Sequence, residues 1–198
     1  MISTDPQKNI ILSIREVEEG LVKASKKIGT DLGIETKGLV LVDKNFINHP
    51  KSKQDKSGFF NKIIVDFDNP ADLQEKLKPY LHRILAVNCR FETAISLFRK
   101  VIPFIPYVSA PNEQSLKWAT EKSLMREKMN IYDSSICPKF IKIGVEDESI
   151  EDKTQYCIDN MTFPVVIKPN GLYSSMLVTR CDTGQDLVRE LEKTFKLI

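Results

Sequence analysis

The sequence predicts an α/β protein in which a doubly wound parallel sheet fills the first 110 residues and a small α+β segment follows. Short apolar, β-branched runs alternate with segments of helical periodicity up to that point. This alternation is typical of βαβ units, whose right-handed crossovers place helices on both faces of a parallel sheet. Pro103, Pro106 and Pro111 then interrupt the chain. We therefore expect one domain at 1–110 and a second at 111–198.

The first domain is expected to contain four buried strands. They are the runs at 9–14, 39–42, 62–67 and 84–87. The helix after the first strand is predicted from apolar spacings of three and four residues, with Gly29 as its stop. The polar stretch 48–58 is expected to be a loop.

Two further helices complete that domain. Asn69 and Pro70 supply the cap and first-turn chemistry for a helix that carries Leu73, Leu77 and Leu81. Pro79 lies inside this helix and predicts a kink or an early end, because it lacks a backbone donor. The last helix is expected over 91–101.

The second domain is expected to begin with a long helix over 113–129. A strand at 139–143, an acidic helix at 149–160, two strands flanking a loop and a helix at 185–195 follow. The last helix is predicted to bury Leu187, Val188, Leu191 and Phe195.

Charge and hydropathy give no support for a protein that binds nucleic acid or membrane. With 29 Lys+Arg and 27 Asp+Glu the net charge is 29 − 27 = +2, which gives no electrostatic footprint for nucleic acid. No apolar run approaches the roughly 20 residues that cross a bilayer, and the N-terminus lacks signal-peptide features. We therefore expect a cytoplasmic protein that binds neither nucleic acid nor membrane.

Metal and dinucleotide sites are not expected. The four cysteines, at positions 89, 137, 157 and 181, form no C-x-x-C pair and are predicted to be buried free thiols. The acidic residues between 146 and 152 fit a solvated helix start better than a metal site. The first strand-to-helix turn, at 13–17, has no glycine, which argues against a conventional nicotinamide or flavin site.

The segment 163–178 is the most informative about function. A β-branched strand delivers Lys168 at its end, a loop with Gly171, Ser174 and Ser175 follows, and an apolar strand returns. Backbone amides and hydroxyls of such a loop donate to phosphate oxygens, and the ammonium supplies a point charge. An ordinary surface hairpin with a solvated lysine is the alternative.

Two motifs in this order resemble ATP-grasp enzymes. Residues 120–129, TEKSLMREKM, followed by Pro138, look like the family's Asp-Lys helix and the proline after it. Residues 163–169, FPVVIKP, resemble the strand before the family's phosphate-covering loop. The first 110 residues are similar to the α/β domain that precedes the ATP-grasp core, and 111–198 to part of its small lid subdomain. The loop has a single glycine where the family often has several, and this predicts lower flexibility.

The resemblance implies a site for ATP. Family members generally use ATP to make an acylphosphate from a carboxylate and then join it to an amine, a thiol or another nucleophile. Lys122 and Lys168 would then contact the phosphates, and Glu92 would bind the substrate. Gly171, Ser174 and Ser175 would lie in the loop that closes over the triphosphate.

The resemblance also implies that Mg²⁺ is bound mainly by a domain that these 198 residues do not contain. We therefore expect the N-terminal part of a ligase, inactive alone, or a chain completed by a second chain. Trp118 is expected to pack on the helix of Lys122, with a role in such an interface as the alternative. A non-catalytic α/β module that binds a small molecule or a protein is the alternative function.

Overall fold

The computed structural model describes residues 7–47, 58–144, 149–172 and 174–197. It contains two compact units, residues 1–117 and 118–198, which we call the N-terminal and C-terminal units. The expected loop at 48–58, apart from Gly58, and the acidic residues 146–148 lie outside the described residues.

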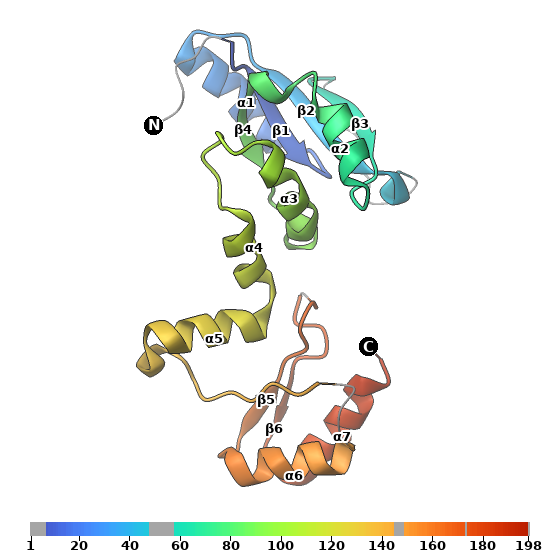
Figure 1. The fold of residues 1–198 in the computed structure, drawn as a ribbon, viewed down its shortest axis with the longest axis vertical. Helices are drawn as coiled ribbons and strands as arrows, with labels where there is room; N and C mark the ends of the chain where they lie inside the picture. The colour runs from blue at the N-terminus through green and yellow to red at the C-terminus, as the bar shows by residue number, and fades with distance from the viewer. Residues whose placement is uncertain (1–6, 48–57, 145–148, 173, 198) are drawn as a thin grey trace. The chain divides into compact units, whose positions relative to one another are not determined.

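The N-terminal unit is built on a parallel sheet of four strands, in the order β3-β2-β1-β4. The strands are β1 (Ile10–Ile14), β2 (Lys37–Asp43), β3 (Phe60–Val65) and β4 (Ile84–Asn88). The chain moves outward from β1 to β3 and then crosses back to place β4 on the other side of β1 (Figure 1). The predicted parallel sheet is confirmed, although β3 starts and ends two residues earlier than expected.

Side chains that alternate along β1 enter two separate cores, one on each face of the sheet. Leu12 packs into the core that contains Leu73 of α2 (Pro70–Leu77) and Phe98 of α3 (Ile95–Val101). Ile11 packs into the core that contains Val22 of α1 (Glu19–Leu32). Because strand side chains point alternately to opposite faces, helices cover both faces of the sheet, as the sequence predicts.

The helix ends follow local chemistry. Asn69 accepts hydrogen bonds from the backbone N–H groups of Ala71 and Asp72, and α2 ends at Leu77, before Pro79, as predicted. Leu81 then begins η2 (Leu81–Arg83), a short 3₁₀ helix. The predicted stop of α1 at Gly29 is wrong, because Gly33, with φ of 66°, forms the left-handed C-cap four residues later.

Gly29 is instead a packing position inside α1, and this gives a stability prediction. A Cβ at Gly29 would lie 2.8 Å from the carbonyl oxygen of Ile34, whereas a Cβ at Gly20 in the same helix would have no heavy atom within 4 Å. We expect Gly29→Ala to lower the free energy of unfolding by about 1–3 kcal/mol through overpacking. Gly20→Ala should be neutral or raise it by about 0.5 kcal/mol through helix propensity. Urea unfolding of both variants checks this, and equal stability would contradict it.

The C-terminal unit combines helices with a small antiparallel sheet. Its helices are α5 (Lys122–Tyr132), α6 (Ile150–Asn160) and α7 (Gly184–Phe195), and α4 (Glu113–Thr120) spans the division between the units. The strands β5 (Val165–Ile167) and β6 (Thr179–Cys181) pair with Val166 opposite Arg180. The core consists of Cys157, Cys181, Leu187 and Leu191, with Phe195 packed against it.

Three predictions for this unit are wrong. The apolar strand expected to return within 163–178 is part of the loop, and the strand that pairs with β5 is β6, Thr179–Cys181. The single helix expected over 113–129 is two helices, because Glu121 has an extended backbone with φ of −98° and ψ of 99°. The strand expected at 139–143 is an extended segment without a strand partner among the described residues. Its apolar alternation still has a structural basis, since Ile141 and Ile143 pack against the core of the unit.

Candidate functional site

The loop between β5 and β6 has an unusual backbone. Gly171, Ser174, Ser175 and Leu177 all have left-handed φ values, from 54° to 73°. For each of the three residues with a Cβ atom, this conformation costs roughly 1 kcal/mol or more. Although the loop has a single glycine, Ser174 and Ser175 also adopt the left-handed backbone conformation that glycine favours. Strained loops of this kind are found disproportionately at ligand-binding sites.

The N-terminus of α5 bonds directly to this loop. The Nζ of Lys122 donates to the carbonyl oxygen of Leu172, 50 residues further along the chain. The backbone N–H of Ser123 donates to Oδ1 of Asn170 at 3.1 Å, and Nδ2 of Asn170 donates to Oγ of Ser123 at 2.9 Å. The break at Glu121 thus starts a helix whose first two residues hold the loop.

The remaining residues predicted to bind phosphate lie on the surface of the same hairpin. Lys168 directly follows β5 and is exposed, as are Gly171, Ser174 and Ser175. Among the described residues, no hydrogen bond or ion pair joins Lys168 to Lys122 or to the serines. Lys122 and the loop are therefore brought together, whereas Lys168 stands at the base of the loop with its ammonium accessible.

In the N-terminal unit, Arg15 lies at the point where the strand order reverses. This point, between the carboxyl ends of β1 and β4, is where open parallel sheets bind ligands. Arg15 follows β1 with φ of 74°, a region that favours glycine. Its guanidinium lies 4.6 Å from the ring centre of Phe46 and 6.0 Å from that of Phe91. It also forms an ion pair with Glu16 at 2.8 Å and bonds to the carbonyl of Thr93 at 3.5 Å. Arg15 thus links the residues that follow β1, β2 and β4.

Glu92 lies near the same edge of the sheet. It begins η3 (Glu92–Ala94), a 3₁₀ turn four residues after the end of β4, and its side chain is exposed. At this edge the carboxyl ends of β1 and β4 are joined by a hydrogen bond. The side-chain amide of Asn88 donates to Oγ of the fully buried Ser13 at 3.3 Å. An exposed carboxylate at this edge suits contact with a substrate amine or cation.

Cys89 at this edge is a thiol of low reactivity. Burial raises its pKa from 9.0 to about 11, against a smaller opposing effect of the Arg15 charge. The thiolate fraction at pH 8 should therefore be about 100-fold lower than for a thiol with the ordinary pKa. We expect alkylation of Cys89 by iodoacetamide, mapped by mass spectrometry, to rise about tenfold per pH unit between pH 8 and 10. A rate that levels off near pH 9 would contradict this.

The pKa of Cys89 also gives the sign of a pH effect on stability. Because the folded-state pKa lies above the unfolded one, the protonated thiol favours the folded state. This contribution is complete below about pH 9 and is lost as the pH rises through 11. Cys89→Ser should therefore make the free energy of unfolding fall less as the pH rises from 9 to 11.

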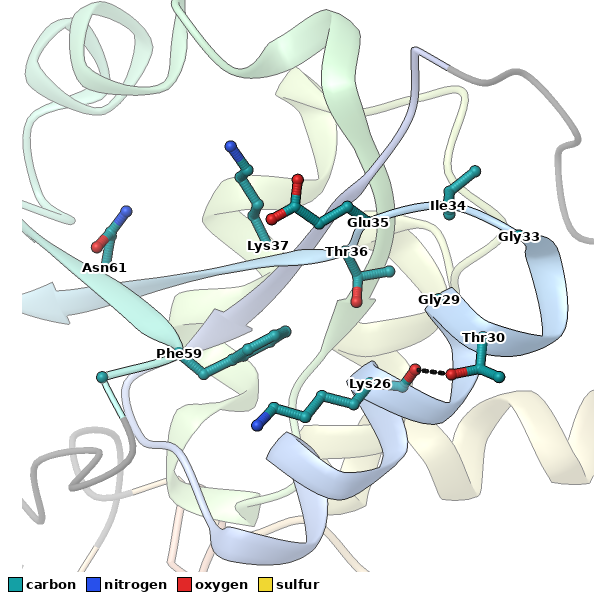
Figure 2. A pocket seen from close by; sticks show the side chains of 11 residues that line it. Lys26, Gly29, Thr30, Gly33, Ile34, Glu35, Thr36, Lys37, Phe59 and Asn61 are labelled. Carbon is teal, nitrogen blue, oxygen red and sulfur yellow. Dashed lines mark hydrogen bonds between the residues drawn. The ribbon is translucent and has the colours of Figure 1, made fainter.

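A pocket of about 780 Å³ lies at the opposite edge of the sheet, at the amino ends of β2 and β3. Its walls come from the C-terminal half of α1, the turn after it and the start of β3. Figure 2 shows Lys26 extending from α1 toward Phe59, whose ring centre lies 5.8 Å from Nζ of Lys26. Lys37 and Glu35 stand above them in the same view. The lining carries the charged side chains of Lys26, Glu35 and Lys37, so it offers a polar binding surface.

The described residues offer no site for a metal. Within the described ranges, no group of three His, Cys, Asp or Glu side chains could hold an ion. Asp152, in the expected acidic helix, accepts a hydrogen bond from the hydroxyl of Ser149, which in turn accepts the Asp152 backbone N–H and caps α6. All four cysteines are free thiols, and three of them are buried. No helix in the described part of the chain is long and apolar enough to span a membrane.

Trp118 contacts the helix that carries Lys122. Nζ of Lys128, on α5, lies 5.5 Å from the centre of the Trp118 rings, and the indole N–H is buried without a hydrogen-bond partner in the described structure. This agrees with the expected packing of Trp118 on that helix.

Sequence reasoning missed Arg15, Ser123 and Asn170. The sequence holds a signal for Arg15, because an arginine stands in the first strand-to-helix turn, where dinucleotide-binding sheets carry glycine. Asn170 follows the FPVVIKP motif directly, but its partner lies 47 residues earlier in the chain, and nothing in the sequence links the two. No protein-family model matches the sequence, and no curated protein matches it significantly.

Proposed function

We propose that this chain supplies the phosphate-holding part of an ATP-dependent ligase that activates a carboxylate and joins it to an amine or another nucleophile. The observation that carries this proposal is the hydrogen bond from Lys122 to Leu172. It puts a cation beside a loop of small residues that follows a second lysine, Lys168. This is the arrangement that the resemblance to ATP-grasp enzymes implies for a triphosphate.

The chemistry assigned to these residues is electrostatic. A carboxylate oxygen of the substrate attacks the γ-phosphorus of ATP, the bond to the β-γ bridging oxygen breaks, and ADP leaves. The nucleophile then attacks the acyl carbon, inorganic phosphate leaves with the bonding electrons, and the proton of the amine or thiol goes to solvent water. Lys122 and Lys168 would neutralise charge that builds on the phosphate oxygens, and the hydroxyls of Ser174 and Ser175 would donate to them.

The proposal assigns no Mg²⁺ site to this chain. The described residues contain no side-chain group that fits it, so we assign no residue to the metal and derive no step through it. The exposed Lys168, the partly buried Lys122 and the serine hydroxyls fit the phosphates themselves. Glu92 remains a predicted contact of the substrate.

Binding of Mg-ATP tests the proposal. A ligand at 100 times its Kd stabilises the folded state by about 2.7 kcal/mol, which raises Tm measurably. Each lysine that bonds to phosphate should contribute about 1.5–3 kcal/mol, so Lys168→Ala should raise Kd roughly 10- to 100-fold. Lys142→Ala, at another exposed lysine of the same unit, is the matched control. No rise in Tm with Mg-ATP, or a rise that Lys168→Ala leaves intact, would contradict phosphate binding here.

Release of ADP, measured for this chain and for any longer natural form of the protein, tests the ligase chemistry separately, and we expect turnover only from the longer form. A pool of carboxylates and amines should increase ADP formation only if the acylphosphate forms. ADP release that does not depend on the carboxylate pool would argue against a ligase even where Mg-ATP binds.

The alternative is a non-catalytic binding module, and the pocket lined by Lys26, Lys37 and Phe59 favours it. A ligand bound there would stabilise the N-terminal unit and would be insensitive to Lys168→Ala. Lys26→Ala is the variant that such binding should respond to.

A further inference from the structure

We propose that Asn170 is a positioning residue that ties the N-terminus of α5 to the β5–β6 loop and so holds Lys122 beside the loop before a nucleotide arrives. This inference rests on the proposed function of the loop. We call the paired hydrogen bonds between Asn170 and Ser123 the clasp.

The clasp uses both ends of one side-chain amide. Oδ1 of Asn170 accepts the backbone N–H of Ser123, and Nδ2 donates to the Ser123 hydroxyl. This orientation is the only one that the partner groups permit, because a flipped amide would place its NH₂ group against the backbone N–H. The clasp therefore fixes the rotation of the Asn170 side chain as well as the distance between helix and loop.

The clasp occupies a helix end that has no local cap. The N-cap residue Glu121 makes no capping hydrogen bond through its side chain. The first N–H groups of a helix have no partner within the helix. Asn170 supplies one from a different part of the chain, and this hydrogen bond stabilises the start of α5 at Lys122.

Packing alone does not fix the start of α5. None of its residues is fully buried, so it contributes no side chain to the core of the C-terminal unit. Hydrogen bonds at its N-terminus then have a large share in setting where Lys122 lies. Lys122 precedes Ser123, and Leu172 lies two residues after Asn170, so the clasp and the lysine contact reinforce each other.

A division of roles follows. The Ser123 N–H is already satisfied by Asn170 and is not a phosphate ligand, whereas the Lys122 ammonium has three donors and uses one on Leu172. When phosphate binds, Lys122 can turn to it while the clasp keeps helix and loop together. Asn170 acts through Lys122 and does not contact the nucleotide.

Two substitutions at Asn170 distinguish the effect of losing the clasp from the effect of adding a negative charge at the same position. Asn170→Ala removes both hydrogen bonds. Asn170→Asp keeps both, since a carboxylate accepts from the N–H and from the hydroxyl of Ser123, but it adds a negative charge beside the phosphate loop. Asn130→Ala, at an exposed asparagine of α5, is the control. Cooperative urea unfolding confirms that each variant folds.

Hydrogen exchange of the full chain without nucleotide measures the clasp. We expect Asn170→Ala to speed exchange of the Ser123 amide and of the loop amides at least fivefold, as the loss of two hydrogen bonds implies, while Asn170→Asp and Asn130→Ala stay within twofold of the wild type. Exchange within twofold of the wild type in Asn170→Ala would overturn the inference and leave the proposed function intact.

Mg-ATP titration of the same proteins measures positioning. Asn170→Ala should raise Kd at least threefold, and Asn170→Asp should raise it while keeping exchange protection. A loosened loop with an unchanged Kd would make the clasp merely structural and would overturn the positioning role. A wild-type chain that does not bind Mg-ATP contradicts the proposed function and the positioning role together, and the exchange data show whether the clasp exists.

Discussion

Leu12→Ala is expected to lower the free energy of unfolding of the N-terminal unit by about 2–5 kcal/mol. Leu12 is completely buried at the centre of β1. Its sheet neighbours are Leu39 on β2 and Val87 on β4, and it packs into the core under α2 and α3. Removal of its side chain loses transfer free energy and leaves a cavity that β1, held on both sides, does not close. Since domains are stable by about 5–15 kcal/mol, this change removes a large fraction of the total.

A second apolar truncation in the same sheet provides the control. Ile64 on β3 is 41% exposed, so Ile64→Ala removes a similar volume without a cavity. Its cost should stay below about 1 kcal/mol, because less apolar area is lost from the interior. Urea unfolding measures both variants, and comparable losses would show that Leu12 is not at the centre of a close-packed core.

Lys122→Ala is expected to weaken Mg-ATP binding about 10- to 100-fold if the loop holds phosphate. A charge-assisted hydrogen bond contributes about 1.5–3 kcal/mol, and each 1.4 kcal/mol is tenfold in Kd. The same change removes the bond to Leu172, so loop amides should also exchange faster in the absence of nucleotide. Calorimetric titration and hydrogen exchange measure the two effects separately.

Lys122→Arg and Lys139→Ala sharpen this test. The arginine keeps the charge but replaces a compact ammonium with a planar fork, so it should restore affinity only in part. Lys139 is an exposed lysine of the same unit, and its removal should change Kd less than twofold. If Lys122→Ala speeds loop exchange and leaves Kd unchanged, Lys122 is a structural residue and the ligand site lies elsewhere.

The N-terminal sheet was predictable because its signals are local. Strand alternation, the Asn69–Pro70 start of α2 and the effect of Pro79 each depend on residues close in sequence. The predicted helix stop at Gly29 is wrong because the sequence does not distinguish a glycine that ends a helix from one that permits close packing inside it. Only the approach of Ile34 and Thr36 distinguishes them, and it depends on how the chain turns back at Gly33 to enter β2.

The C-terminal unit was less predictable because its elements are short and depend on distant partners. No glycine or proline marks the break between α4 and α5, where Glu121 has an extended backbone. The segment 139–143 alternates like a strand, but strand formation needs a hydrogen-bonding neighbour as well as an apolar face. Ile141 and Ile143 pack on the core, and no strand in the described part of the chain pairs with this segment.

Some features of the candidate site were likewise predictable from the sequence, and others were not. The sequence by itself determined an α/β protein with helices on both faces of its first sheet, a lysine at the end of a β-branched strand and a small-residue loop after it, because these are patterns of neighbouring residues. Only the tertiary structure decided that Lys122 meets Leu172, that Asn170 caps α5, and that Arg15 adopts a glycine-like backbone between Phe46 and Phe91. Each of these depends on groups brought together by packing across tens of residues, and hydrophobic periodicity carries no information about which polar groups will then lie within hydrogen-bonding distance.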